Sequence, residues 1–207
     1  KALNAIQLLS DQLPEITVVG AVIGDTTKEA NAILGLKDGI PVIGGGMDQS
    51  ACAIGAGTIS EGVVSETTGS ALCIQMVADR PDKDKRKLVP VYAHSIQGKY
   101  LFVPVCPTAG MAFKWFKDNF ACEETSIARK QGTDVYDMLT DLAAKIPAGS
   151  DGLIMLPHLM GAFSPYSNPD AKGSFTGFSV HHTKGHFVRA ILESVAFLLR
   201  QNLEVIA

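Results

Sequence analysis

The chain has 207 residues, of which 46% are hydrophobic and 19% charged, and its formal net charge is −3. That length suits one large domain or two smaller ones, each with a hydrophobic core. The mild negative charge and the mixed signs of the most charged stretch, 79–87, argue against a nucleic-acid binder, which needs clustered Lys and Arg. No apolar run approaches the length of a membrane span, so we expect no membrane segment and no signal peptide.

The four cysteines are far apart and form no CxxC pair, which argues against a zinc site. In a chain of this size they are expected to be buried free thiols, which indicates a cytoplasmic protein. They are Cys52, Cys73, Cys106 and Cys122.

Both ends of the sequence have the pattern of an internal piece of a longer protein. The first residue is Lys1, and the chain opens within a helical pattern (Leu3, Ile6, Leu9). The last helical pattern reaches Ala207 without a glycine cap or a proline stop. We therefore expect residues 1–207 to be a fragment.

Short strands and helices separated by glycine turns are predicted at the start of the chain. A β-rich run covers 15–23, and Thr26 with Glu29 has the spacing of a capping box. Gly35 fits the end of the helix that follows, and a strand is predicted at 41–44. Strand and helix thus alternate up to the glycine run that begins at position 44.

Two hairpins are predicted next. In the first, the apolar runs 63–65 and 71–77 flank a turn at 66–70. In the second, the runs 88–96 and 100–105 are joined by a turn that contains glycine. Prolines in the second hairpin favour edge positions for its strands.

Three helices are predicted after the hairpins: one beginning after Gly110, one capped by Thr133, and one from Thr183 to the end of the chain. Strands are predicted at 153–156 and 174–178, with a long loop between them. Hairpins followed by helices indicate an α/β domain with a mixed sheet.

The sharpest feature is Gly44–Gly45–Gly46–Met47–Asp48–Gln49. Three glycines after a strand let backbone amides approach a ligand. Asp48 then lies at the carboxyl end of a strand, where α/β sheets present ligands, and can accept a proton from a substrate hydroxyl. Gln49 can hydrogen-bond a neighbouring hydroxyl. Alternatively, Asp48 caps a helix formed by the small residues 50–57.

The second candidate is Thr67–Thr68–Gly69–Ser70. A turn rich in hydroxyls and glycine offers O–H and N–H donors to an anion such as phosphate. The alternative is an ordinary β-turn, in which the same residue types are common. The chain has no GxxxxGK[ST] loop, so this is not a P-loop of that class.

A metal site is not expected. His182 and His186 have helical spacing beside His181, but no acidic residue lies in the same turn. Thr183 indicates a plain helix start there. No GxSxG motif and no activated cysteine is evident.

Read together, these motifs resemble those of the FGGY carbohydrate kinases. The resemblance rests on four segments in the family's order: GGGMDQSACAIGAG, SETTGSAL, TAGMAFKWFKDNF, and residues 152–197, which begin GLIMLPHLMGAFSPYSNPDAKGSFTGF. It implies the two-lobed actin-like ATPase fold, of the ribonuclease H-like α/β class. Residues 1–56 would be the end of the sugar-binding first lobe. Residues 57–207 would be the nucleotide-binding second lobe, cut before its adenosine segment.

The resemblance also implies a role for each candidate residue. Asp48 would be the catalytic base, and Met47 and Gln49 would contact the sugar. ATP would be held by Thr67, Thr68, Gly69, Ser70, Gly110 and Lys114, with Mg²⁺ as the metal cofactor. No protein ligand for the metal is assigned.

Departures from the family pattern affect the finer expectations. The loop reads T-T-G-S where many members have G-T-S-G, so the hydroxyl that touches phosphate is open. The family often has E-R-T at the positions of Ala162–Phe163–Ser164, so the identity of the sugar substrate is open. D-xylulose is the expected substrate and ATP the donor. Gluconate, ribulose, glycerol, or a non-catalytic regulator of the same fold are the alternatives.

Two family motifs, one at the amino end and one late, are missing from the sequence. We therefore expect the chain alone to be inactive. A homodimer is left open as a partner.

Overall fold

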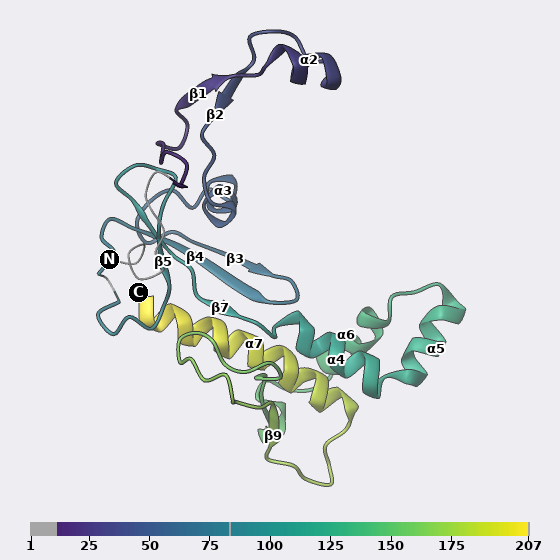
Figure 1. Cartoon of the computed structure of the whole chain (residues 1–207). Helices are drawn as coiled ribbons and strands as arrows, with labels where there is room; N and C mark the ends of the chain where they lie inside the picture. Colours follow the sequence, from purple (N-terminus) through teal and green to yellow (C-terminus); the bar gives the residue numbers. More distant parts are fainter. Residues whose placement is uncertain (1–11, 83, 207) are drawn as a thin grey trace.

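A computed structural model of the chain describes residues 12–82 and 84–206. Figure 1 shows a central sheet, an arm that extends from it on the amino-terminal side, and a group of helices at its other end. The helical pattern expected at Leu3, Ile6 and Leu9 lies outside the described residues.

The arm consists of two short strands and a helix, α2 (Lys28–Leu34). Strand β1 (Val22–Asp25) pairs antiparallel with β2 (Pro41–Ile43), so the first strand is shorter and later than the predicted run. The cap of α2 is Thr27, whose hydroxyl accepts a hydrogen bond from the Ala30 amide at 3.2 Å. The prediction of Thr26 as the cap was therefore wrong by one residue.

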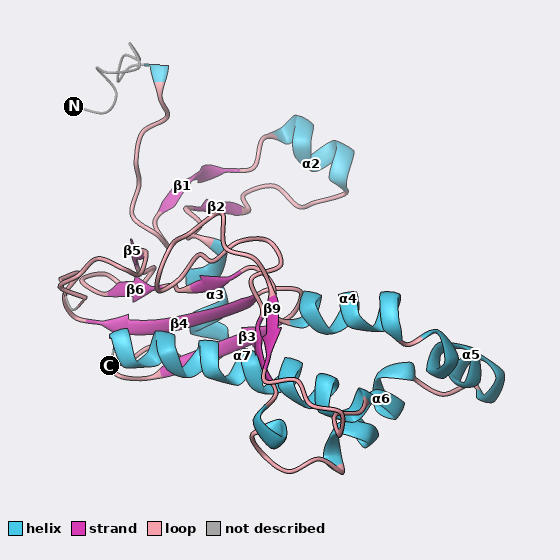
Figure 2. Ribbon diagram, turned by 90° about the horizontal axis from the view of Figure 1, so that it is seen from below, coloured by secondary structure: helices cyan, strands magenta, loops and turns pink. Residues whose placement is uncertain are grey.

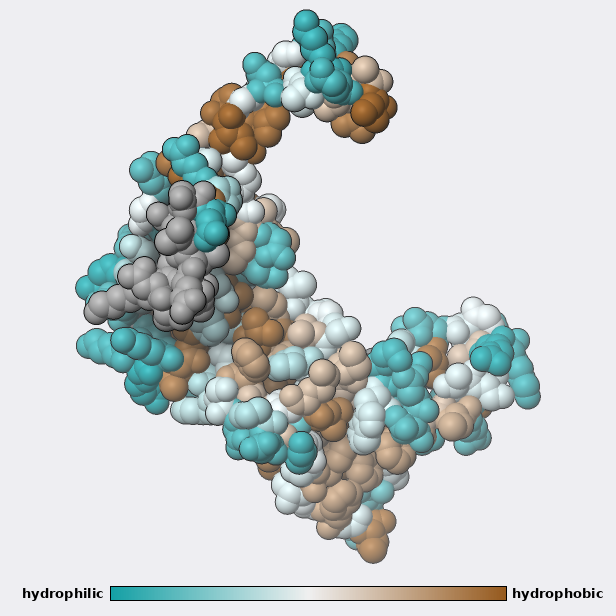
Figure 3. Space-filling model, in the orientation of Figure 1, coloured by the Kyte–Doolittle hydropathy of each residue, from teal (hydrophilic) through white to brown (hydrophobic). Residues whose placement is uncertain are grey.

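Apolar side chains of the arm are exposed. Val22 is 63% exposed and Ile33 is 83% exposed, and the arm is brown in Figure 3 where these side chains gather. Within the described residues, no helix has both the length and the apolar composition needed to cross a bilayer.

The central sheet has the order β3-β4-β6-β5, and β7 also pairs with β4. Every ladder between the described strands is antiparallel, so the expectation of a mixed sheet was wrong. For the β3–β4 and β5–β6 pairs the short connections explain the direction, because tight turns join only antiparallel neighbours. The strands are β3 (Val64–Thr68), β4 (Leu72–Ala78), β5 (Val91–Ala93), β6 (Tyr100–Phe102) and β7 (Val105–Cys106).

Strand β4 is covered on both faces because its side chains alternate in direction. Leu72, Ile74 and Met76 pack in one cluster with Leu198 of α7 (Lys184–Ile206). On the other face Val77 packs with Ala53 of α3 (Asp48–Gly55). Figure 2 shows α7 running along the sheet. The helix that begins at Asp48 is thus fixed to the face of β4 opposite α7.

The helical group holds one helix that the sequence did not predict, α5 (Cys122–Gln131). It follows α4 (Gly110–Phe120) directly, and α6 (Val135–Ala144) comes next. The cap of α6 is Asp134, whose side chain accepts from the Tyr136 amide at 2.8 Å, not the predicted Thr133. Beside α7, strand β8 (Ile154–Leu156) pairs with β9 (Ser174–Thr176), and a 3-10 turn, η2 (Ser150–Gly152), precedes them.

The cysteines differ in exposure. All four are free, but only Cys106 is buried; Cys73 is half-buried, and Cys52 and Cys122 are exposed. The expectation of four buried thiols was therefore wrong, because Cys52 and Cys122 lie on helix faces turned to solvent.

We expect this difference to set thiol reactivity. Burial raises the pKa of the Cys106 thiol to about 11, which lowers its reactive thiolate fraction about 100-fold below that of an ordinary thiol. With an aromatic disulfide reagent at pH 8, Cys52 and Cys122 should react first and Cys106 only on unfolding. Equal rates for all four thiols would contradict the burial described here.

Candidate functional site

Asp48 is the first residue of α3 and follows the glycine run after one residue, Met47. Met47 is the N-cap and makes no side-chain cap bond, so the interpretation of Asp48 as the cap residue was wrong by one position. The Asp48 side chain is exposed, and its Oδ1 accepts from the Gln49 amide at 2.7 Å. A carboxylate in the first turn is stabilised by the helix dipole and remains open to solvent.

The glycine run is required by close packing around the start of α3. A Cβ at Gly46 would lie 2.1 Å from the Ser95 Oγ, and one at Gly44 would lie 2.7 Å from the Thr17 Oγ1. The Ser95 amide also donates to the Ser50 Oγ at 2.7 Å, and Ser50 is fully buried. The turn between β5 and β6 therefore packs against the bend that carries Asp48.

Gln49 is bonded to the sheet through its side-chain oxygen. Its Oε1 accepts from the Gln75 Nε2 at 2.6 Å and from the Cys73 Sγ at 3.2 Å. Burial raises the pKa of the Cys73 thiol, and the nearby Asp48 charge adds to that rise. Sequence reasoning missed Cys73 and Gln75, although a glutamine inside an apolar strand was an available signal.

The predicted phosphate turn divides between a strand and a tight loop. Thr67 and Thr68 belong to β3, opposite Cys73 and Leu72 respectively. Since directly opposed residues share a face, Thr67 lies on the α3 side of the sheet and Thr68 on the α7 side. The Thr68 hydroxyl donates to the Glu66 Oε1.

The predicted glycine at position 110 lies against this turn. The Gly110 amide donates to the Gly69 carbonyl at 3.0 Å, and the Met111 amide donates to the Ser70 carbonyl at 3.0 Å. A Cβ at Gly110 would be 2.3 Å from the Gly69 oxygen. The structure thus brings residues 69–70 and 110 together, and the glycine is needed for contact with the turn itself.

Lys114 is exposed on α4 and forms an ion pair with Asp118. Lys117 also approaches Asp118, with 2.5 Å between its Nζ and Oδ1. Hydrogen bonds from Lys114 and then Lys117 lower the pKa of the Asp118 carboxyl. The structure therefore pairs the Lys114 ammonium within its own helix. Among the described residues it forms no hydrogen bond or ion pair with residues 67–70.

The three histidines stand apart from these residues. The His186 Nδ1 accepts from the Thr183 amide at 3.0 Å, and its Nε2 lies 3.1 Å from the Asp151 Oδ2. These bonds tie the start of α7 to η2. Over residues 12–82 and 84–206, no group of three His, Cys, Asp or Glu side chains is arranged to hold a metal ion.

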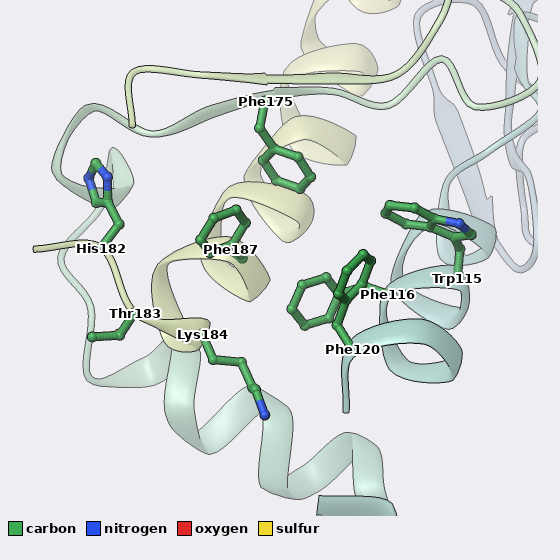
Figure 4. Close-up of a pocket in the computed structure, with 8 residues that line it drawn as sticks. All are labelled: Trp115, Phe116, Phe120, Phe175, His182, Thr183, Lys184 and Phe187. Carbon is green, nitrogen blue, oxygen red and sulfur yellow. The ribbon is translucent and has the colours of Figure 1, made fainter. Parts of the chain in front are cut away.

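An aromatic hollow of about 390 Å³ lies beside the start of α7. Figure 4 shows rings from α4, β9 and α7 around it, together with Lys184. None of the predicted site residues lines it. Its lining is Trp115, Phe116, Phe120, Phe175, His182, Thr183, Lys184 and Phe187.

Comparison with known proteins identifies the family. The profile described as "FGGY family of carbohydrate kinases, C-terminal domain" matches residues 65–207, and the corresponding N-terminal domain profile matches residues 1–55. The chain belongs to the FGGY family of carbohydrate kinases. Its fold is accordingly the actin-like ATPase fold of FGGY kinases, several of which are close structural matches.

Relatives of this FGGY chain include kinases of two sugars. The gluconokinase of Bacillus licheniformis is 31% identical over 199 residues, which cover 96% of this chain and 39% of the relative. The crystal structure of xylulose kinase from Rhodospirillum rubrum matches with a TM-score of 0.86 and 32% identity, covering 98% of this chain and 39% of that one. The crystal structure of gluconate kinase from Lactobacillus acidophilus matches with a TM-score of 0.86 and 26% identity, covering 98% of this chain and 39% of that one. This chain thus spans about 39% of the length of these relatives.

Proposed function

We propose that the protein containing this chain is an ATP-dependent sugar kinase in which Asp48 is the general base. The observation that carries the proposal is the placement of Asp48. Its carboxylate is exposed at the first position of α3, and the next residue, Gln49, is bonded to β4. Strand β4 pairs with β3, which carries Thr67. A base and a hydroxyl-bearing hairpin are thereby joined through direct contacts.

The chemistry requires little else from the protein. Phosphoryl transfer depends mainly on positioning, on charge neutralisation and on one group that accepts the proton of the attacking hydroxyl. Asp48 would accept that proton. The family membership implies ATP as donor, and Mg²⁺, when bound, would neutralise charge on its phosphates.

The described residues fit a phosphate best at Thr67 and Ser70. Both are exposed, and their hydroxyls have no hydrogen-bond partner among the described residues. By contrast, the Thr68 hydroxyl is bonded to Glu66. The amides of Gly110 and Met111 donate to carbonyls, so they are not available to the nucleotide. Mg²⁺ usually binds phosphates, water and one or two carboxylates, so a full protein cage is not required.

D-xylulose is our first candidate for the sugar. The late signature of the sequence and the similarity to the Rhodospirillum rubrum xylulose kinase, at 32% identity, support it. Gluconate is the second candidate, favoured by the 31% identity to the Bacillus licheniformis gluconokinase.

A substrate panel on the complete protein tests this proposal. We expect kcat/KM for D-xylulose to exceed the values for gluconate, ribulose and glycerol by at least about tenfold, which corresponds to about 1.4 kcal/mol of transition-state discrimination. A higher kcat/KM for gluconate would replace the first candidate with the second. No sugar-dependent ADP release with any of the four would favour a non-catalytic regulator.

The remaining expectations belong to the same proposal. Residues 1–56 would be the C-terminal end of the sugar-binding lobe, and residues 57–207 would form most of the nucleotide-binding lobe. The sugar and ATP would be the binding partners. A cytoplasmic location is supported by the four free thiols.

A further inference from the structure

A buried glutamine connects the start of α3 to the edge of the sheet. Gln75 on β4 is 2% exposed. Its Nε2 donates to the Gln49 Oε1 at 2.6 Å, and its Oε1 accepts from the Ser65 Oγ at 2.8 Å. Ser65 lies directly opposite Gln75 in the β3–β4 ladder. The three side chains form a relay across the α3 face of the sheet, next to Asp48.

The relay has a defined direction. The Ser65 hydroxyl donates to the Gln75 oxygen, which turns the Gln75 nitrogen toward Gln49. A second donor, the Cys73 thiol, meets the same Gln49 oxygen at 3.2 Å. Its raised pKa keeps this thiol protonated, and in this contact the S–H group donates to Gln49. Two donors therefore hold the Gln49 carbonyl toward β4.

This direction determines what Gln49 offers to a ligand. An amide is planar, so an oxygen held toward β4 turns the NH₂ group the other way. That NH₂ group has no partner among residues 12–82 and 84–206. Gln49 thus presents hydrogen-bond donors beside the Asp48 carboxylate, which is an acceptor.

Resting on the kinase function proposed above, we propose that Gln75 is a positioning residue that fixes the amide of Gln49 so that it recognises an acceptor oxygen of the sugar. Asp48 and Gln49 would then recognise two groups of one substrate. One is a hydroxyl that gives its proton to Asp48, and the other is a neighbouring oxygen that accepts a hydrogen bond from Gln49. Gln75 itself touches no substrate.

Two substitutions in the complete protein test the direction of the relay. In Gln75→Glu, the ionised carboxylate accepts from Ser65 and can only accept from Gln49, so the Gln49 amide must turn its oxygen outward. We expect the KM for the sugar to rise about tenfold, with kcat and the KM for ATP changed less than threefold. In Gln75→Met the relay is removed without reversal, so the sugar KM should rise only about threefold.

The pH profile separates positioning from a structural role. Burial favours the neutral form of a carboxyl. When the carboxyl introduced by Gln75→Glu is protonated, it donates to Gln49 as the native amide does, so lowering the pH should restore the sugar KM of this variant toward the wild-type value. Met76→Leu, on the opposite face of β4, controls for core perturbation. Gln131→Glu, at the exposed end of α5, controls for the added charge. Neither should change the sugar KM.

Three outcomes would overturn the proposal: wild-type sugar KM in both Gln75 variants, an equal loss of sugar and ATP binding, or a defect in Gln75→Glu that is unaffected by pH. If the wild-type protein has no kinase activity, the proposed function fails separately. The orientation of the Gln49 amide is then tested by NMR of protein labelled with ¹⁵N-glutamine. The Gln49 NH₂ protons should exchange quickly with water in wild type and slowly in Gln75→Glu at high pH. Unchanged exchange would overturn the relay.

Discussion

Replacement of Asp48 by Asn is expected to lower kcat of the complete protein about 1,000-fold, with the KM for the sugar changed less than threefold. Asn has the same shape as Asp but cannot accept the proton of the attacking hydroxyl. Because the Asp48 side chain is exposed at the first position of α3, the substitution should leave the fold intact. Coupled-enzyme detection of ADP gives kcat, and calorimetry gives the affinity for the sugar.

A matched control is Asp141→Asn, which makes the same change on the exposed side of α6. It should retain wild-type kcat. If the Asp48 variant kept more than a tenth of the wild-type rate, Asp48 would not be the base. If the variant lost its affinity for the sugar together with its rate, the role of Asp48 would be binding and not proton transfer.

Elements with a strong local pattern could be predicted from the sequence. The apolar stripe of α7 marks that helix because one side of it is buried against a core. The apolar run 71–77 marks β4 because that strand is covered on both faces. Helix α5 had no such pattern: of its residues only Ala128 is buried. A polar helix on the surface leaves no periodic signal, so it was missed. The two cap errors, at positions 26 and 133, arose because a second capping residue follows each site directly.

The candidate site could be located but not assembled from the sequence. The glycine run identified Asp48, since a bend and an acid are adjacent in the chain. The bond between Gln49 and Gln75 joins residues 26 positions apart, and sequence spacing alone does not reveal such a contact. Thr67 and Thr68 lie on opposite faces of the sheet, and this placement likewise depends on the register of β3 with β4. Because residues 66–70 were predicted to form a turn, the sequence did not predict that register.

Replacement of Gly110 by Ala is expected to destabilise the protein by about 3 kcal/mol and to lower its Tm by about 10 °C. The added Cβ would lie 2.3 Å from the Gly69 carbonyl oxygen. That atom belongs to the backbone, so either the turn at 69–70 or the start of α4 must move. Movement would also break the bond from the Gly110 amide to the same oxygen. Differential scanning calorimetry measures the effect.

A fall in stability in Gly110→Ala would identify the contact with Gly69 as the cause, because helix propensity acts in the opposite direction. Gly110 is the first residue of a helix, where propensity alone favours Ala over Gly by up to about 1 kcal/mol. Gly69→Ala makes the same change on the other side of the contact, where no atom lies within 4 Å of the new Cβ, and its Tm should stay within about 2 °C of wild type. Equal Tm values for the two variants would contradict the contact. Because the displaced turn carries Ser70 and adjoins Thr67, Gly110→Ala should also raise the KM for ATP in the complete protein more than the KM for the sugar.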